Sequence, residues 1–311
     1  MSVLLLADHD KGELSPATAR LVAAANQLGP VDVLVVAENP GNIAASAAQI
    51  AGVRIVQVVK AAETAESITN SLESLAQRYQ SVSASASSVG KDVIPRLAAK
   101  LDIQPVTDIV AIEGANRFTR PIYAGNALET VTDPQPKHLL TFRASAFRPA
   151  ASGNAAPVEN LDLSVTSAAR FLAAHRTESD TPDLATAQIV IGGGVSVASA
   201  EGFQLIEKLG KTLGAAVGAT RAAVDAGYAP NDWQIGQTGK IIAPDLYIAI
   251  GISGALQHLA GIQGAKKIFA INTDPEAPLV KIADVALIGD LFEIVPQLIA
   301  ELEKSGIRKP Q

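Results

Sequence analysis

Short, almost continuously apolar runs alternate with helical patterns from the first residues of the chain. Runs rich in Val, Ile or Leu cover Val3–Ala7, Val33–Ala37 and Arg54–Val59. Runs that lack an alternating polar face are typical of parallel strands covered on both sides. Helical patterns of suitable length follow at Pro16–Gln27, Asn42–Ala51 and Ala65–Tyr79. The alternation therefore predicts a doubly wound α/β domain with a mostly parallel sheet.

The middle of the chain changes character. Further strands are expected at Gln80–Ser83, Asp108–Ala111 and His138–Phe142. The segment Phe147–Asn160 is rich in Ala, Pro, Ser, Gly and Asn, which predicts a loop or an excursion to a sheet edge. A polar, charged segment at His175–Thr186 predicts the linker between domains.

The alternation restarts after this linker. Strands are expected at Ala187–Ile191, Ala215–Val217, Leu246–Ile250, Lys267–Ile271 and Asp284–Ile288. Helices are expected at Ser199–Leu213, Gly254–Ala260 and Leu291–Lys304. Since 311 residues are about twice the usual size of one domain, we predict two doubly wound α/β domains, residues 1–180 and 181–311.

Composition excludes several classes of protein. The chain has no cysteine, which removes disulfide scaffolds, zinc ribbons and thiol nucleophiles. Its net charge is −6 and no basic block occurs, so nucleic-acid binding is not expected. The four histidines are far apart in sequence, so neither a metal site nor a catalytic constellation is indicated. The uncharged stretch from Leu246 to Ala265 is interrupted by polar residues and glycines, so no membrane insertion is expected.

Four junctions after expected strands of the second half carry residues that suit a ligand. They are Gly192–Gly194, Gly251–Gly254, Asn272-Thr273-Asp274 and Gly289-Asp290. In open α/β sheets, ligands bind beyond the carboxyl ends of the strands. Glycines there allow a phosphate to approach the backbone, and Asn or Asp can bind ribose. Together the junctions favour a nucleotide site, although each glycine alone is explained as well by a tight turn.

Two polar segments and one histidine leave alternatives open. Arg221 near a helix start suits an anionic ligand, but it also suits a surface ion pair with Asp225, four residues on. The segment Gln234–Lys240 is a polar, glycine-punctuated loop between apolar stretches. His258 follows the Gly251–Gly254 turn, and it is either part of the site or a satisfied core residue.

The residues from Gly218 to Leu279 resemble the alpha subunits of electron transfer flavoproteins. This stretch reads GATRAAVDAGYAPNDWQIGQTGKIIAPDLYIAIGISGALQHLAGIQGAKKIFAINTDPEAPL. The first half is similar to the same family at Val93–Arg96 and at Thr119–Asn126. The resemblance implies an αβ heterodimer that carries one FAD, mainly in the second domain, with the first domain docking the beta subunit.

The family resemblance also implies a role in metabolism. Such an electron carrier, which is not an enzyme in the usual sense, takes electrons from acyl-CoA and related dehydrogenases of fatty acid β-oxidation. It passes them to a quinone oxidoreductase or another acceptor. The start of the sequence shows no basic leader. We therefore expect a bacterial cytoplasmic protein, with a processed mitochondrial matrix form as the alternative.

Roles for individual residues follow from the resemblance. Arg221 would lie over the isoalloxazine, Gln237 and Thr238 would hydrogen-bond the ring, Thr238 toward N5, and His258 would lie near its pyrimidine end. A flavin electron carrier needs such cationic and hydrogen-bonding groups, because they stabilise the reduced ring. Thr220, Ser253 and Asn272 would contact ribityl or pyrophosphate groups, and Asp290 the adenosine ribose. The full predicted set is Thr220, Arg221, Gln237, Thr238, Gly239, Gly251, Ser253, Gly254, Gln257, His258, Asn272, Thr273, Asp274 and Asp290.

The sequence departs from the family at one position. Where the family reads Gly-Gly-Arg-Gly, this chain reads Gly193-Gly194-Val195-Ser196. Two alternatives to a conventional carrier stay open, and the loss of that arginine points only to the first of them. One is a scaffold or ligand-binding subunit without flavin. The other is an electron-bifurcating member with a second flavin in its partner.

Overall fold

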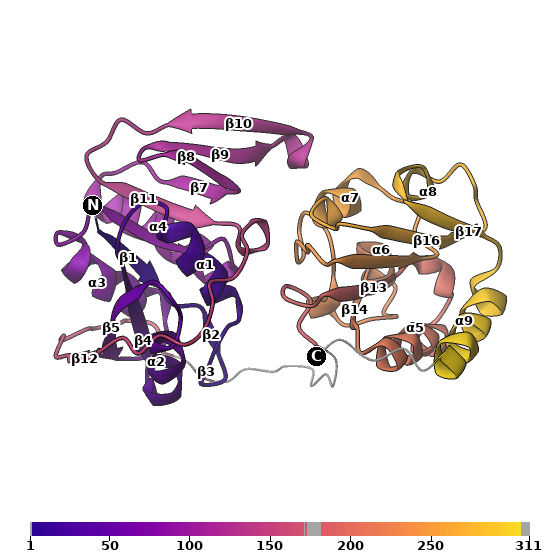
Figure 1. Cartoon of the computed structure of the whole chain (residues 1–311), viewed down its shortest axis with the longest axis horizontal. Coiled ribbons are helices and arrows are strands. Elements are labelled where there is room, and N and C mark those ends of the chain that lie inside the picture. The colour runs from indigo at the N-terminus through magenta and orange to yellow at the C-terminus, as the bar shows by residue number, and fades with distance from the viewer. Residues whose placement is uncertain (1, 171, 173–181, 306–311) are drawn as a thin grey trace. The chain divides into compact units, whose positions relative to one another are not determined.

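The computed structural model describes residues 2–170, 172 and 182–305. The chain divides into two compact units (Figure 1). Unit 1 contains Met1–Tyr123 and Ala127–Ala174, and unit 2 contains Ala124–Asn126 and His175–Gln311. The predicted domain boundary at 180/181, and the linker as far as residue 181, lie outside the described residues.

Unit 1 is built on a parallel sheet of seven strands within the described residues. Its order is β12-β5-β4-β1-β6-β11-β7. The strands are β1 (Val3–Leu6), β4 (Val31–Ala37), β5 (Val53–Lys60), β6 (Ser81–Ser85), β7 (Val106–Ile109), β11 (His138–Phe142) and β12 (Val158–Leu161). Strand β12 pairs with β5 at the sheet edge, so the segment before it is the predicted edge excursion.

Helices cover both faces of this sheet. Side chains of α1 (Ala17–Ala25) and α2 (Gly41–Ala48) join one buried apolar cluster, and those of α3 (Ala65–Ala76) and α4 (Ser88–Leu101) join the other. The hydroxyl of Thr64 accepts a hydrogen bond from the Ser67 N–H (3.2 Å) and so caps the start of α3. Burial on both faces explains why the strands read as continuous apolar runs.

A small antiparallel sheet in unit 1 was not predicted. It contains β8 (Ala111–Gly114), β9 (Arg117–Ile122) and β10 (Ala127–Thr132) in the order β10-β9-β8. The strand expected at Asp108–Ala111 is divided between β7 and β8. Helix α4 and the short hairpin of β2 (His9–Asp10) and β3 (Glu13–Leu14) were also missed. Strand β10 alternates exposed and half-buried residues, so it lacks the continuous apolar run that marks the buried strands.

Unit 2 has a parallel five-stranded sheet within the described residues, in the order β14-β13-β15-β16-β17. The strands are β13 (Ile189–Gly193), β14 (Ala216–Ala219), β15 (Leu246–Ile250), β16 (Ile268–Asn272) and β17 (Val285–Ile288). From β13 the chain first adds β14 on one side and then β15 on the other. The strand order therefore reverses between β13 and β15.

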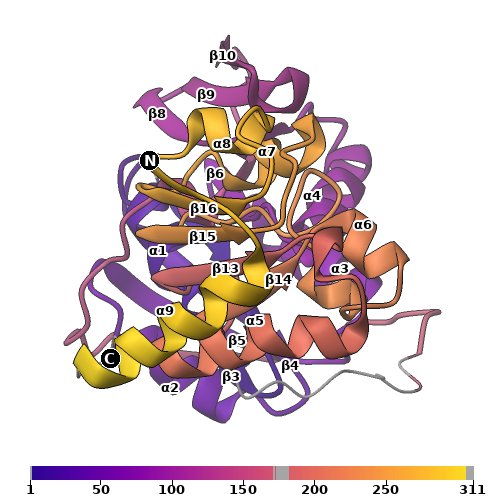
Figure 2. The same ribbon diagram turned by 90° about the vertical axis from the view of Figure 1, so that its right-hand side faces the viewer.

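Helices cover both faces of the second sheet as well. The apolar cluster on one face includes residues of α5 (Ala200–Leu213), α6 (Arg221–Asp225) and α9 (Leu291–Ser305), and α5 and α9 lie side by side (Figures 1 and 2). Residues of α7 (Leu256–Ile262) and α8 (Pro278–Ile282) join the cluster on the other face. The prediction of two doubly wound α/β parts is confirmed. No helix of the described residues is long and apolar enough to span a membrane.

Candidate functional site

A cavity of about 410 Å³ opens at the carboxyl ends of β13, β14 and β15 in unit 2. Its walls come from segments 194–196, 220–225, 234–238 and 251–258. This is the point where the strand order reverses, and crevices at such points are the usual ligand sites of open α/β sheets. Segments that are far apart in sequence thus meet at one place.

The three glycines after β13 are explained mainly by close packing. A Cβ atom at Gly192 would lie 2.0 Å from Tyr247 Oη, and one at Gly193 would lie 2.6 Å from the Phe203 ring. A Cβ atom at Gly194 would lie 1.9 Å from the Gly251 carbonyl oxygen. Only Gly194 of the three lines the cavity among the described residues.

The turn after β15 needs glycine for a backbone reason. Gly251 has a φ of 61° and Gly254 a φ of 89°, in the left-handed region that glycine tolerates best. Gly251 and Ser253 line the cavity, whereas Gly254 packs against the Leu279 backbone. The hydroxyl of Ser253 has no hydrogen-bond partner within the described part of the chain, so it is free to bind a ligand.

Arg221 is the one cationic side chain among the described residues that line the cavity. It begins α6, which Thr220 caps by accepting a hydrogen bond from the Ala223 N–H (3.3 Å). Arg221 Nε also donates to Asp225 Oδ2 (3.3 Å), and these side chains are 68% and 64% exposed. The surface ion pair therefore exists, but so exposed a pair contributes little stability. The guanidinium can exchange this partner for a ligand at small cost.

The loop after Gln234 forms one wall of the cavity. Gln234 Nε2 donates to Thr238 Oγ1 (2.9 Å), and the Gln237 N–H donates to the Gln257 carbonyl (2.8 Å). A Cβ atom at Gly239 would lie 2.3 Å from the Gln234 carbonyl oxygen, so Gly239 permits the turn and does not line the cavity. The loop thus places Gln237 and Thr238 at the cavity, as does α7 with Gln257.

His258 lines the cavity from α7, but both of its ring nitrogens bind protein atoms. Nδ1 lies 3.1 Å from the Ile235 carbonyl oxygen, which can only accept, so Nδ1 carries the proton. Nε2 then accepts the hydrogen bond from the Tyr247 hydroxyl at 2.8 Å. Burial lowers the pKa of His258 to about 4, so the imidazole is neutral at pH 7. His258 therefore lines the cavity and is at the same time a buried residue whose hydrogen bonds are satisfied by the protein.

The other predicted residues lie outside the cavity lining. Asn272 Nδ2 donates to the Ile252 carbonyl (2.9 Å), and its Oδ1 accepts from the Asp274 N–H (3.0 Å). Thr273 is exposed beside them. Asp290 Oδ1 accepts from the Phe292 N–H (2.8 Å) at the start of α9. Asn272 ends β16, and the other residues follow β16 or β17, along the same carboxyl edge of the sheet.

Part of the cavity wall lies outside the predicted set of site residues, although Gly194, Gln234 and Gly236 belong to segments that the sequence had singled out. The lining residues outside the predicted set are Gly194, Val195, Ser196, Ala222, Asp225, Gln234, Ile235, Gly236, Ile252 and Ala255. Most are apolar or small and carry no chemical signal in sequence. Val195, which replaces the family's arginine, is 48% exposed at the cavity. Its position one residue after Gly194 is the signal that could have placed it there.

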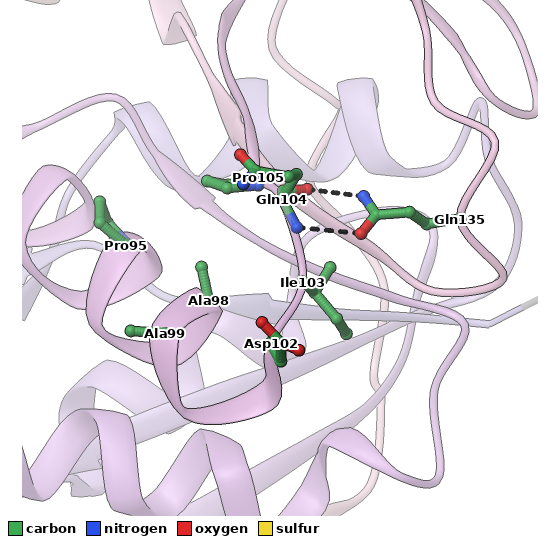
Figure 3. A pocket seen from close by; sticks show the side chains of 8 residues that line it. All are labelled: Pro95, Ala98, Ala99, Asp102, Ile103, Gln104, Pro105 and Gln135. Atoms are coloured by element: carbon green, nitrogen blue, oxygen red, sulfur yellow. Dashed lines mark hydrogen bonds between the residues drawn. The ribbon is translucent and has the colours of Figure 1, made fainter.

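Unit 1 has a different kind of cavity, of about 320 Å³, at the end of α4 (Figure 3). The Gln135 amide pairs with the Gln104 backbone there. The Gln104 N–H donates to Oε1, and Nε2 donates to the Gln104 carbonyl, both at 2.9 Å. These polar groups are already satisfied, so the unit 2 cavity is the stronger candidate. Across the described residues, no group of three or more His, Asp or Glu side chains could hold a metal ion.

The sequence was compared with known protein families. Residues 3–166 match the "Electron transfer flavoprotein domain", and residues 183–263 match the "Electron transfer flavoprotein FAD-binding domain". The second match contains all four segments that line the cavity, and it contains most predicted site residues. Asn272, Thr273, Asp274 and Asp290 lie beyond it.

Similar proteins cover almost the whole chain. An "Electron transfer flavoprotein subunit alpha" of Paracoccus denitrificans is 47% identical over 97% of this chain and 100% of its own length. A "Probable electron transfer flavoprotein subunit alpha, mitochondrial" of Caenorhabditis elegans is 46% identical over 97% of this chain and 93% of its own. The "Electron transfer flavoprotein subunit alpha" of Pseudomonas aeruginosa is 43% identical over 96% of this chain and 99% of its own length.

Proposed function

The chain belongs to the family of electron transfer flavoprotein alpha subunits, and from this premise we propose that its second unit binds one FAD at the cavity. Proteins of this family are electron carriers, and their alpha subunits work in a heterodimer with a beta subunit. When bound, FAD supplies the reversible uptake and release of electrons. The alternative of an electron-bifurcating member is not favoured by these relatives.

The residues at the cavity fit the ring-bearing half of FAD. Ile235 and Ile252 offer apolar walls to a flat ring, and Arg221 offers the only cation of the described lining. The side chains of Gln237 and Ser253 have no hydrogen-bond partner within the described residues, so they can serve the ring edge and the ribityl hydroxyls. The adenosine half would extend along the strand ends toward Asn272 and Asp290. The observation that supports the proposal is that Arg221, Gln237 and Ser253 line one cavity at the point where the strand order reverses.

Each side chain has a separate role in this proposal. Arg221 carries a planar cationic group that can stack on an aromatic plane, so it would stabilise negative charge on the reduced ring. Gln237 and Thr238 would orient the ring. His258 is neutral, so it would shape the site and would not add a second positive charge.

The partners and the location are proposed from the family alone. We propose that acyl-CoA and related dehydrogenases donate the electrons and that a quinone oxidoreductase or another acceptor receives them. The first unit would dock the beta subunit. The bacterial cytoplasm remains the expected location, and both bacterial and mitochondrial proteins occur among the relatives.

The flavin content of the heterodimer tests the proposal directly. The chain would be purified together with its beta subunit, and flavin would be counted from the visible spectrum and after release by denaturation. One FAD per heterodimer is the expected result. Two flavins would favour the bifurcating alternative, and none would favour a scaffold subunit.

Replacement of Arg221 tests the site. Arg221→Ala should lower the flavin midpoint potential by tens of millivolts, because the cation stabilises the reduced ring. Lys304→Ala is a matched control, since Lys304 is an exposed cation paired with Glu301 on α9 and does not line the cavity. Unchanged potentials in the Arg221 variant at full FAD occupancy would remove Arg221 from the site.

A further inference from the structure

His258 lines the cavity, and its hydrogen bonds connect three parts of unit 2. It lies on α7, it accepts a hydrogen bond from Tyr247 on β15 (2.8 Å), and its Nδ1–H donates to the Ile235 carbonyl (3.1 Å). Tyr247 is fully buried and His258 is 6% exposed. The imidazole is therefore held from two sides by groups that water does not reach.

The Ile235 carbonyl belongs to the loop that carries Gln237 and Thr238. This loop has one more polar attachment to α7, through the Gln237 N–H and the Gln257 carbonyl (2.8 Å). It also packs closely on the helix, because a Cβ atom at Gly261 would lie 2.6 Å from Gly236 Cα. The position of the loop thus depends on the position of His258.

The Tyr247 hydroxyl occupies space that a glycine on the neighbouring strand β13 leaves open. A Cβ atom at Gly192 on β13 would lie 2.0 Å from Tyr247 Oη, so only glycine leaves room for the hydroxyl there. The ring itself packs in the apolar cluster with Val190 and Ala249. Phenylalanine would satisfy that apolar packing equally well. The hydroxyl is therefore needed for the hydrogen bond to His258 and not for packing.

We propose that Tyr247 is a positioning residue of the cofactor site, which fixes His258 and, through the Ile235 carbonyl, the loop that presents Gln237 and Thr238. This inference rests on the proposed function. Without the hydroxyl, Nε2 of His258 is a buried acceptor that has no donor, and such a state is unfavourable. The imidazole then turns, or water enters, and the loop loses one of the two hydrogen bonds described above that hold it to α7.

The test compares Tyr247→Phe with the wild type, both purified as heterodimers with the beta subunit. Amide hydrogen exchange of residues 234–240 should become faster, while that of β15 stays slow. The Kd of FAD should be about threefold to tenfold higher in the variant than in the wild type, which is the range expected for one lost hydrogen bond. Tyr228→Phe is the matched control, since its hydroxyl has no hydrogen-bond partner within the described residues and it does not line the cavity. This variant should behave as wild type.

A double mutant separates positioning from packing. In a His258→Leu background, Tyr247→Phe should change the FAD Kd and the exchange of residues 234–240 by less than about twofold, because its target is gone. Equal effects of Tyr247→Phe with and without His258 would overturn the inference. So would unchanged loop exchange in the single variant.

The same samples separate this inference from the proposed function. If the wild-type heterodimer holds no FAD, the proposed function fails, whereas the exchange comparison still reports whether Tyr247 anchors the loop. If the wild type holds one FAD and Tyr247→Phe matches it in exchange and in Kd, the inference about Tyr247 alone fails.

Discussion

The two units share one architecture and differ in how they bury polar groups. In unit 1, Asp32 is 2% exposed and binds Arg54 through both carboxylate oxygens (2.7 and 2.6 Å) and the Tyr79 hydroxyl (2.7 Å). In unit 2, the buried polar pair is Tyr247 with the neutral His258. The first network holds a buried carboxylate against Arg54, which is 57% exposed and lines a surface cavity of about 650 Å³ together with Tyr79. The second network contains no ion pair and lies at the candidate site.

The carboxyl edges of the two sheets also differ in whether their polar groups have hydrogen-bond partners within the described residues. After β1, the Thr18 hydroxyl donates to the Asp8 carbonyl (2.9 Å) and accepts from the Asp8 N–H (3.2 Å), while burial raises the pKa of the Asp8 carboxyl. After β15, the Ser253 hydroxyl has no partner within the described residues, and the same is true of the Gln237 side chain. The same sheet topology is thus compatible with polar groups that are paired at the carboxyl ends of the strands and with polar groups that are left unpaired. The loops that follow the strands decide which of the two occurs.

The largest expected effect is in unit 1. Asp32→Ala should lower the free energy of unfolding of that unit by about 3 kcal/mol, because the buried Tyr79 hydroxyl and the 57% exposed Arg54 lose their charged acceptor. The chain has one tryptophan, Trp233, which lies in unit 2. Urea unfolding followed by Trp233 fluorescence and by far-UV circular dichroism would therefore separate the units. The fluorescence transition should stay in place while part of the dichroism transition moves to lower urea.

A shift of both transitions by the same amount would contradict this expectation. It would mean that the two units unfold as one cooperative structure, and the comparison between them would lose its thermodynamic basis. Lys91→Ala, an exposed change on α4 in the same unit, is a control that should move neither transition by more than about 0.5 kcal/mol.

The second effect concerns the glycines. Gly192→Ala should destabilise unit 2 by about 2–3 kcal/mol, because the new methyl group collides with the buried Tyr247 hydroxyl. Gly41→Ala in α2 has nothing within 4 Å of its Cβ position and should be neutral or slightly stabilising. Thermal and urea unfolding of both variants measure the difference. If Gly192→Ala were as stable as the wild type, the close packing of Gly192 and Tyr247 would be wrong.

The third effect is a pH dependence confined to unit 2. The pKa of His258 is about 4 in the folded chain and 6.5 ordinarily, so the unfolded chain takes up the proton first as the pH falls. The stabilising contribution is complete above pH 6.5 and is lost between pH 6.5 and 4. It should amount to about 2 kcal/mol between pH 7 and pH 5.

His258→Gln should lack this contribution. The measurement is the free energy of unfolding from Trp233 fluorescence at pH 7 and pH 5 for both proteins. The wild type should lose more stability than the variant on acidification. The same loss in both would show that His258 is not held neutral in the folded state.

The smallest effect is expected at Val195, which is half exposed at the cavity. Val195→Arg restores the family's cation and should keep FAD bound, with tighter heterodimer association or a raised flavin potential. An exposed contact contributes below about 1 kcal/mol, and salt should weaken it. Redox titration and heterodimer dissociation at two ionic strengths measure this. Identical behaviour of both proteins would make Val195 a silent substitution.

Much of the fold follows from local sequence patterns. The expected strand Leu246–Ile250 matches β15, and the expected helix Leu291–Lys304 ends one residue before α9 does. These elements are marked by continuous apolar runs or by helical spacing, which short stretches of sequence reveal. The antiparallel strands 111–132 escaped prediction because exposed and half-buried residues interrupt them, so no continuous apolar run marks them.

The site was only partly predictable. Arg221, Gln237, Thr238 and His258 were assigned by resemblance to a family, and the structure brings these four residues to one cavity. Asn272 and Asp290 were assigned on the same basis, yet their side chains bind nearby backbone N–H and carbonyl groups outside the cavity lining. Whether they also reach FAD remains a prediction.

The sequence by itself determined the parallel α/β class, the positions of the buried strands and the family, because these depend on patterns carried by neighbouring residues. Only the tertiary structure decided that Gly192 makes room for Tyr247, that Tyr247 hydrogen-bonds His258, and that His258 is neutral. Hydrogen-bond partners and burial come from segments that are distant in sequence. The free energy of a charge or a polar group depends on those partners and on exclusion of water, which no local pattern specifies.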